Sequence, residues 1–312
     1  MTPPRRRASW QGRAVDWLLK RVMKRRKLEG KIERTRLVIR LVAERQWRKP
    51  RGVLVRPAHG APVPAEWVEP HPLPPGGSPR RVLVYLHGGA YIFCSPRTHR
   101  PLTTFLARHI PARVFVPDYR LAPEHPFPAA LEDALACLRW LVAQGTAPGD
   151  LVLAGDSAGG GLALAALLAL REAGETLPAA AACLAPWTDL AATGRSVMAN
   201  SESDAWVYGE TVAMGAAVYL GTTPATHPLA SPLYADLRGL PPLLIHVSAS
   251  EVLLDDSVRL AAQARAAGVP VTLKVWPGLP HVWQGFVPFI PEARQSLREI
   301  ADFLAAAPDS PG

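Results

Sequence analysis

The chain has 312 residues, 48% of them apolar, and carries a formal net charge of +9 at pH 7. Its length and apolar content suit a single large α/β domain with insertions and a sizeable buried core. No apolar run reaches the roughly 18 residues that a membrane-spanning helix needs. No apolar stretch follows the basic start MTPPRRRASW, so the sequence predicts neither a membrane span nor a secretory signal.

The positive charge is concentrated in an N-terminal arm. Residues 1–51 contain 18 Lys and Arg against 4 Asp and Glu, whereas the rest of the chain has 17 basic and 22 acidic residues. Four apolar residues of the arm recur at the spacing of one helix face: Val15, Leu18, Leu19 and Val22. Such a helix either packs on the chain's own body or makes a weak contact with an anionic membrane surface. No zinc-finger, helix-turn-helix or RNA-binding signature accompanies the charge, so no nucleic-acid partner is expected.

The three cysteines, Cys94, Cys137 and Cys183, are odd in number and lie in apolar sequence. We interpret them as buried free thiols in a reducing compartment, which predicts a cytoplasmic protein. Their spacing does not match a metal site.

Beyond a Pro/Gly-rich connector at residues 71–79, strand patterns alternate with helix patterns. Short strands are predicted before the connector, at residues 52–56 and 66–69. After it, strands are predicted at residues 81–86, 112–119, 150–155, 179–185, 241–249 and 271–276. Helices are predicted at residues 128–143, 159–172, 256–267 and 291–306. This alternation is typical of βαβ crossovers and of a mainly parallel sheet in an α/β fold.

One long segment interrupts the alternation. Residues 187–235 lie between two strands, contain no clear strand of their own, and are too long for a simple connection. We interpret them as a partly helical insertion that, together with residues 1–50, caps the ends of the strands. The main α/β domain then comprises residues 51–186 and 236–312.

The strongest chemical signal is the sequence LVLAGDSAGG at residues 151–160. It places G-x-S-x-G between a predicted strand and a predicted helix, which is the context of a nucleophile elbow. Side chains at Gly155 and Gly159 would clash in so sharp a turn, and the turn presents the Ser157 hydroxyl at the edge of the sheet. Because Ser157 stands at a helix N-terminus, nearby N–H groups favour developing negative charge.

A second signal, YLHGGAY at residues 85–91, follows a buried strand. Two successive glycines let backbone N–H groups point into a site without obstruction. An oxyanion hole made of the amides of Gly88, Gly89 and Ala158 is therefore expected. His87 precedes the turn and is expected to orient this loop.

His281 is the candidate general base, because it alone among the nine histidines lies in a loop after the last predicted strand. It also follows the serine and a group of acids in the chain order of this sheet type. His246 lies within a strand and is expected to pack in the core. The remaining histidines are expected to have no matching partner: His59, His71, His99, His109, His125 and His227.

These motifs, with DYRLAPEHPFPAALED at residues 118–133, resemble the hormone-sensitive lipase family of α/β-hydrolases in its bacterial esterase branch. The resemblance covers roughly residues 50–305. It implies an eight-stranded, mostly parallel sheet flanked by helices, a helical cap, and ester hydrolysis without a metal or an organic cofactor. It is compatible with a homodimer. Asp118, Tyr119 and Arg120 are expected to brace the loop beneath the site.

One departure from the family is Ala90, where a third glycine is usual. Since the implied donors are the amides of residues 88 and 89, Ala90 is expected to cost little and to narrow the substrate pocket.

The acid of the triad has three candidates in SASEVLLDD, residues 248–256. Glu251 lies just beyond the end of a strand, where a carboxylate can accept a hydrogen bond from His281 Nδ1. Asp255, the second candidate, and Asp256 stand at the start of the next helix, where an acid caps the helix or favours its positive end. The family pattern also has its acid at the position of Glu251, although it is more often an Asp.

The resulting hypothesis is a serine carboxylesterase for short- to medium-chain acyl esters, with Ser157, Glu251 and His281 as its triad. A lactonase of the same mechanism is the nearest alternative. A non-catalytic small-molecule receptor on the same fold is disfavoured, because such receptors lack the triad histidine. The sequence does not identify the physiological ester.

Overall fold

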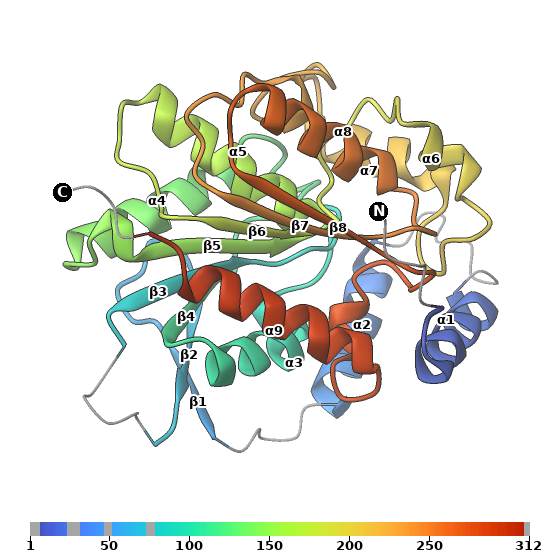
Figure 1. Cartoon of the computed structure of the whole chain (residues 1–312), viewed down its shortest axis with the longest axis horizontal. Coiled ribbons are helices and arrows are strands. Elements are labelled where there is room, and N and C mark those ends of the chain that lie inside the picture. Colours follow the sequence, from blue (N-terminus) through green and yellow to red (C-terminus); the bar gives the residue numbers. More distant parts are fainter. Residues whose placement is uncertain (1–6, 24–31, 47–51, 73–78, 309–312) are drawn as a thin grey trace.

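A computed structural model describes residues 7–23, 32–46, 52–72 and 79–308 (Figure 1). Most of the predicted connector, residues 73–78, lies outside these ranges. A sheet of eight strands runs through the molecule in the order β1-β2-β4-β3-β5-β6-β7-β8. The strands are β1 (Val53–Pro57), β2 (Ala65–Pro70), β3 (Arg81–Leu86), β4 (Ala112–Pro117), β5 (Leu151–Asp156), β6 (Ala181–Leu184), β7 (Leu243–Ser248) and β8 (Val271–Trp276). The β1–β2 and β2–β4 pairs are antiparallel and the other five pairs of the described sheet are parallel, so the predicted mostly parallel eight-stranded sheet is confirmed.

The helices that connect or cover these strands lie on both faces of the sheet. They are α1 (Trp10–Met23), α2 (Ile32–Gln46), α3 (Pro96–His109), α4 (Ala129–Ala143), α5 (Ala158–Glu172), α6 (Arg195–Ala199), α7 (Gly209–Leu220), α8 (Leu254–Ala266) and α9 (Pro291–Ala305). Short 3₁₀ turns are η1 (Pro148–Asp150), η2 (Pro232–Tyr234) and η3 (Trp283–Phe286).

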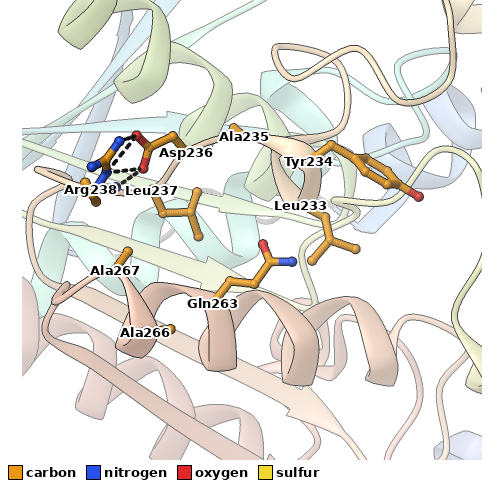
Figure 2. A pocket seen from close by; sticks show the side chains of 9 residues that line it. All are labelled: Leu233, Tyr234, Ala235, Asp236, Leu237, Arg238, Gln263, Ala266 and Ala267. Carbon is orange, nitrogen blue, oxygen red and sulfur yellow. Dashed lines mark hydrogen bonds and ion pairs between the residues drawn. The ribbon is translucent and has the colours of Figure 1, made fainter.

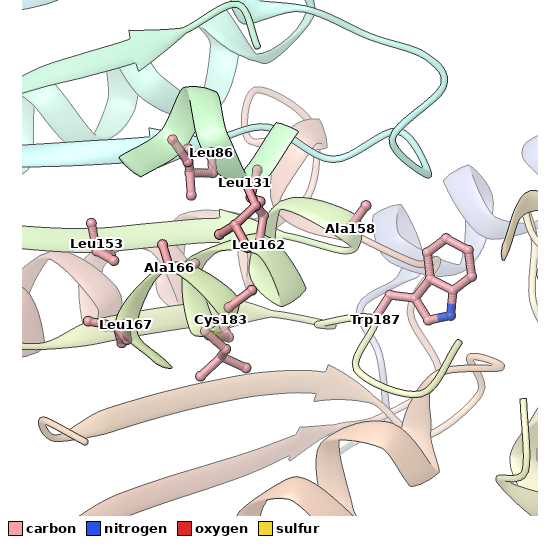
Figure 3. Packing of buried hydrophobic residues seen from close by; sticks show 14 of the residues in the cluster. Leu86, Leu131, Leu153, Ala158, Leu162, Ala166, Leu167, Cys183 and Trp187 are labelled. Atoms are coloured by element: carbon pink, nitrogen blue, oxygen red, sulfur yellow. The ribbon is translucent and has the colours of Figure 1, made fainter. Parts of the chain in front are cut away.

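Successive side chains of each strand point to opposite faces, and this divides the core in two. In β3, Val82 and Val84 pack with α4, α5 and α8, whereas Leu83 and Tyr85 pack with α3 and α9. Figure 1 shows the two helical layers above and below the sheet. Figure 3 shows part of the first core, where leucines and alanines of α5 cover β3 and β5 up to Ala158. Burial on both faces explains why the central strands have almost uninterrupted apolar sequences.

Helix α3 was not among the helices predicted from the sequence. Its sequence, PRTHRPLTTFLARH, contains two prolines and two histidines, which disguise the apolar periodicity. Pro96 occupies the first helical turn, where a proline is tolerated because its missing N–H would have no helical partner. Pro101 lies inside the helix, and packing of Leu102, Phe105 and Leu106 in the second core outweighs its cost.

The segment between β6 and β7 folds as α6, α7 and η2, with no strand between residues 187 and 235. At the other end of the chain, α1 and α2 lie near the same end of the sheet as α6 and α7 (Figure 1). The Ser9 N–H and hydroxyl donate to the Glu292 carboxylate of α9, and Arg36 donates to the carbonyl oxygens of Ile92 and Ala122. That these two parts form one cap remains a prediction.

Helix α1 confirms the predicted helix in the arm, but its predicted apolar face is split. Val15 packs against the second core, whereas the Leu18 side chain is 53% exposed. The Val22 side chain lies outside the described residues. None of the described helices is long and apolar enough to cross a membrane.

Candidate active site

Ser157 forms the turn between β5 and α5, in the conformation expected of an elbow. Its φ is +52° and its ψ is −121°, a region that is strained for a residue with a side chain. A Cβ at Gly155 would overlap the carbonyl oxygen of Gly159, and a Cβ at Gly159 would overlap that of Leu86. Both glycines are therefore required sterically. The Ser157 N–H donates to the Leu184 carbonyl oxygen over 2.8 Å, which fixes the elbow to the end of β6.

The HGGAY loop corrects the expected set of oxyanion donors. The Gly88 N–H donates to Asp156 Oδ1 over 3.0 Å, so it is not free to bind a substrate oxygen. The next two amides, of Gly89 and Ala90, make no hydrogen bond among the described residues. Both residues have positive φ, +116° and +56°, so Ala90 adopts a conformation that favours glycine. The prediction for Gly88 is wrong, and the loop offers the amides of Gly89 and Ala90 instead.

Asp156 is the reason that the Gly88 amide is occupied. It is 3% exposed and its Oδ1 also accepts a 2.6 Å hydrogen bond from the Tyr85 hydroxyl. Its Oδ2 lies 3.3 Å from His99 Nε2. The expectation that His99 has no partner is therefore wrong. Burial opposes ionisation of Asp156, but the charge and hydrogen bond of His99 outweigh it and lower the pKa of Asp156 below its usual value.

His87 supports the HGGAY loop, as the sequence predicts. Its ring stacks on Tyr119 with centroids 4.2 Å apart, and the Tyr119 hydroxyl donates to the His87 carbonyl oxygen over 2.5 Å. Burial lowers the pKa of His87 to about 3, so the ring is neutral. Arg120 is held in turn by Asp133, with 2.9 Å between Nε and Oδ1. Tyr119 therefore braces the loop, as expected, whereas Arg120 contacts the first turns of α4.

Glu251 and His281 meet across two loops at the carboxyl ends of β7 and β8. His281 Nδ1 lies 2.5 Å from Glu251 Oε2, and the other carboxylate oxygen accepts the Ser248 N–H over 2.6 Å. Glu251 is fully buried and His281 is 7% exposed. The Ser250 hydroxyl donates to the Leu279 carbonyl oxygen over 3.1 Å and joins the two loops. This pairing fixes one tautomer of His281, with Nδ1 as the donor and Nε2 free to accept a proton.

The environment of the pair favours a charged imidazole. Burial lowers the pKa of His281, but the hydrogen bond and charge of Glu251 outweigh it, so this pKa is raised above its usual value. The charges of Asp204 and Asp156 act in the same direction. Asp156 directly precedes Ser157 in the elbow. The Ser157 hydroxyl makes no hydrogen bond among the described residues, and in enzymes without substrate such contacts often tighten only on binding.

The two aspartates beyond Glu251 lie in the first turn of α8, as predicted, but they bind other parts of the chain. Asp255 Oδ2 accepts the Ser196 N–H of α6 over 3.1 Å. Asp256 is fully buried, and its Oδ2 accepts the N–H groups of Thr188 and Asp189 over 2.8 and 2.9 Å. Neither carboxylate contacts His281. Both attach α8 to the inserted segment instead of capping their own helix.

An open pocket lies elsewhere, between residues 233–238 and α8 (Figure 2). Its charged lining residues, Asp236 and Arg238, pair with each other over 2.6 Å, and Ser157 and His281 are not part of it. Across the described residues, no group of three His, Cys, Asp or Glu side chains could hold a metal ion.

Comparison with known proteins agrees with this geometry. Residues 83–285 match the family model described as alpha/beta hydrolase fold. An acetyl-hydrolase of Streptomyces hygroscopicus is 47% identical over 243 residues, covering 78% of this chain and 80% of that protein. The esterase LipU of Mycobacterium tuberculosis is 38% identical over 265 residues, covering 83% and 89%.

Solved structures give the same result. The crystal structure of an esterase from the bacterial hormone-sensitive lipase family superposes with a TM-score of 0.89 at 43% identity, covering 96% of this chain and 98% of that one. The elbow, the HGGAY loop and the buried acid–histidine pair thus stand in a fold shared over nearly the whole chain. This chain belongs to the α/β-hydrolase family, in the branch of the bacterial hormone-sensitive lipase esterases.

Proposed function

We propose that the chain is a serine carboxylesterase that hydrolyses short- to medium-chain acyl esters with Ser157, His281 and Glu251 as its triad. Carboxylic ester hydrolysis is the chemistry named for the esterases to which the chain is similar. The observation that carries the residue assignment is the 2.5 Å bond between Glu251 and His281 Nδ1, which leaves Nε2 as the basic atom. The strained elbow supports Ser157 as the nucleophile.

In the proposed reaction, His281 Nε2 takes the proton of the Ser157 hydroxyl as Oγ attacks the ester carbonyl carbon. Glu251 stabilises the resulting imidazolium through the Nδ1–H bond. The imidazolium then gives its proton to the departing alcohol oxygen, leaving an acyl-serine. Water attacks this acyl group while His281 accepts its proton, and the carboxylic acid leaves as Ser157 regains a proton.

The oxyanion formed in both steps needs donors aimed at one point. We assign this role to the amides of Gly89, Ala90 and Ala158. Gly88 instead holds the loop through Asp156. The Ala158 N–H stands at the N-terminus of α5, where the helix dipole also favours negative charge. Loss of one such donor typically costs about 10²–10³ in kcat.

The residues beside the elbow also bear on the size of substrate that the site accepts. A Cβ added at Gly215 of α7 would lie 3.5 Å from Trp187 and 3.9 Å from the Ala90 methyl group, so these three residues stand together. Trp187 follows β6, and its backbone N–H donates to the Ser157 carbonyl oxygen over 2.9 Å. An indole and a methyl group beside the elbow favour small acyl or alcohol groups, which supports the proposed short- to medium-chain preference.

The test is hydrolysis of p-nitrophenyl acetate, butyrate, octanoate and palmitate by the wild type and by Ser157→Ala. We expect turnover highest on the short esters and reduced by about 10⁴–10⁶-fold in the variant. Stoichiometric labelling of the wild type by a serine-directed phosphonate, mapped to the peptide containing Ser157, should accompany it. Undiminished turnover in the folded variant would refute the assignment. A panel of γ- and δ-lactones on the same enzyme decides between the esterase and the alternative lactonase.

We further propose weak contact of α1 with an anionic membrane surface. Its solvent face presents Trp10, Trp17 and Leu18, which are 69%, 59% and 53% exposed, beside the exposed Arg13 and Arg21. The Arg21 guanidinium lies 5.4 Å from the Trp17 ring centroid. Indole, leucine and arginine side chains on one face are typical of helices that lie in a lipid interface.

Co-sedimentation with vesicles of phosphatidylglycerol and phosphatidylcholine tests this contact. The full-length wild type should bind the anionic vesicles and lose that binding at high salt, since the charge attraction is screened. A variant with Trp17→Ser and Leu18→Ser should bind less. Val258→Ser, on the exposed face of α8, is the matched control. Equal binding by all three proteins would remove the proposal.

The proposal has two further parts, the location of the protein and its oligomeric state. Cys94, Cys137 and Cys183 are free thiols, which supports a cytoplasmic location. Strand β8 forms one edge of the sheet and offers a surface on which a second copy could pair. Sedimentation equilibrium of the purified chain decides between monomer and dimer.

A further inference from the structure

A tight turn in the inserted segment lies against the loop that carries Glu251. The N–H groups of Ser203 and Asp204 both donate to the Asn200 carbonyl oxygen, over 2.9 and 2.8 Å. The turn spans residues 200–204, and the Asp204 side chain is 1% exposed. A buried carboxylate on a connecting segment is expensive unless it is well paired, so its partners are informative.

Side chains of the turn bind successive backbone groups of the Glu251 loop. Asn200 Nδ2 donates to the carbonyl oxygens of Glu251 and Ala249, over 2.9 and 3.3 Å. The Ser203 hydroxyl donates to the Ser250 carbonyl oxygen over 2.8 Å. These bonds depend on the identity of the two side chains, because the backbone of the turn supplies none of them.

Asp204 completes the contact from the opposite direction. Its Oδ2 accepts the Val252 N–H over 3.0 Å, immediately after Glu251. Its Oδ1 accepts the N–H groups of Trp206 and Val207 over 2.9 and 3.1 Å. Three N–H donors suit a negatively charged carboxylate. The loop at residues 249–252 is thus bonded at each of its four residues by the turn at residues 200–204.

Asp204 also acts electrostatically on the pair that the loop positions. Its negative charge raises the pKa of both Glu251 and His281, after the larger effects of burial and of their mutual bond. The charges of Glu251 and of Asp156, the last residue of β5, raise the pKa of His281 as well. A second carboxylate beside the imidazole favours the imidazolium that forms when His281 takes the serine proton.

We propose that Asp204, with Asn200, is a positioning residue for the Glu251–His281 pair: the turn fixes the Glu251 loop, and the Asp204 charge stabilises the imidazolium. The inference rests on the proposed function, since it assumes that the pair acts on Ser157. Two side chains of the inserted segment, those of Asn200 and Asp204, then position the reacting pair. A segment that shifts away from the sheet would carry the acid out of register with His281.

The test combines kinetics with a measurement that needs no substrate. Wild type, Asp204→Asn, Asn200→Ala and the control Glu202→Gln, an exposed acid on the same turn, are compared on p-nitrophenyl butyrate. Histidine labelled with ¹⁵N gives the titration midpoint of His281 by NMR, with His281→Gln to assign the signal. Thermal unfolding identifies the variants that fold.

For Asp204→Asn we expect kcat about 10- to 100-fold lower with KM little changed, because misplacing a catalytic group by about 1 Å costs as much as 100-fold. The His281 midpoint should move to lower pH. Asn200→Ala should lower both as well, through a weakened Glu251–His281 bond, and it replaces Asp204→Asn if that variant does not fold. Glu202→Gln should match the wild type.

Two results would overturn the proposal. One is a folded variant with wild-type kcat and midpoint. The other is a lower kcat with an unchanged midpoint, which is the signature of a purely structural role. If the wild type itself hydrolyses no ester, the proposed function fails, whereas the NMR midpoints still decide whether Asp204 and Asn200 act on His281.

Discussion

Two fully buried carboxylates stand five residues apart after β7, and they have different partners. Glu251 binds the His281 ring over 2.5 Å, whereas Asp256 binds the backbone N–H groups of Thr188 and Asp189. Burial raises the pKa of both side chains. The partner, not the burial, therefore separates a group suited to proton-transfer chemistry from one that fixes a segment in place.

Removal of each carboxylate should therefore change a different property of the protein. In the proposed triad, loss of the Glu251 carboxylate removes the group that orients the base, so its effect should appear in the rate. Loss of the Asp256 carboxylate leaves two buried amides without acceptors, so its effect should appear in the free energy of unfolding. If both variants lost the same property, this division would be wrong.

The largest expected effect is on turnover. Glu251→Gln should lower kcat by about 10⁴-fold, because an amide in place of the acid favours the wrong tautomer of the histidine. Asp255→Asn, the matched control from the same stretch, should stay within a few-fold of the wild type. Steady-state hydrolysis of p-nitrophenyl butyrate measures both. The reverse ranking would move the acid to Asp255.

The same assay gives a pH profile for the intact pair. The pKa of His281 is raised above 6.5, so kcat/KM of the wild type should rise with pH to a midpoint above that value. The raised pKa also means that this group stabilises the fold fully below the unfolded-state pKa and loses that contribution as pH rises through the folded value.

The three groups that we propose to react, Ser157, Glu251 and His281, could be predicted from the sequence because each depends on local signals. Ser157 lies in the G-x-S-x-G motif, in which Gly155 is required by its close contact with Gly159, four residues on. Glu251 and His281 follow strands whose apolar sequences show where the sheet ends, and parallel strands bring those ends together. The eight-stranded, mostly parallel sheet follows from the family resemblance and is confirmed.

What the sequence could not show depends on side chains meeting across long separations. The Gly88 amide is occupied because Asp156, 68 positions along the chain, turns its carboxylate toward it. Asp156 also explains His99, which had appeared to have no partner. The turn containing Asp204 meets the Glu251 loop 48 positions away, and no periodicity records that contact.

The next effect, on stability, should come from Asp256→Ala. Since the pKa of Asp256 is raised to about 7, we expect it to be protonated at pH 5, where no buried charge then complicates the comparison. The variant should unfold more easily by about 1–3 kcal/mol for each of the two orphaned amides. Because Asp256 does not contact His281, kcat of the folded variant should stay near the wild-type value. Urea unfolding and the esterase assay give the two numbers.

The smallest expected effect is on the pH dependence of the free energy of unfolding, to which the raised pKa of Asp256 contributes. Burial raises its pKa from 3.8 to about 7, so the folded chain binds a proton here that the unfolded chain has released. Its contribution to stability is therefore greatest below pH 4 and declines as pH rises toward and past 7, by at most about 4 kcal/mol.

Asp256→Asn removes this titration and keeps an oxygen that can accept the Thr188 and Asp189 N–H bonds. The variant's amide group adds a constant offset, since Oδ1 of the wild-type residue has no hydrogen-bond partner among the described residues. The informative quantity is the slope: between pH 5 and pH 8 the wild type should lose more stability than the variant. Parallel curves would show that Asp256 is ionised over this whole pH range. Its two hydrogen bonds from backbone amides would then outweigh the effect of burial, and its pKa would be that of an ordinary surface aspartate.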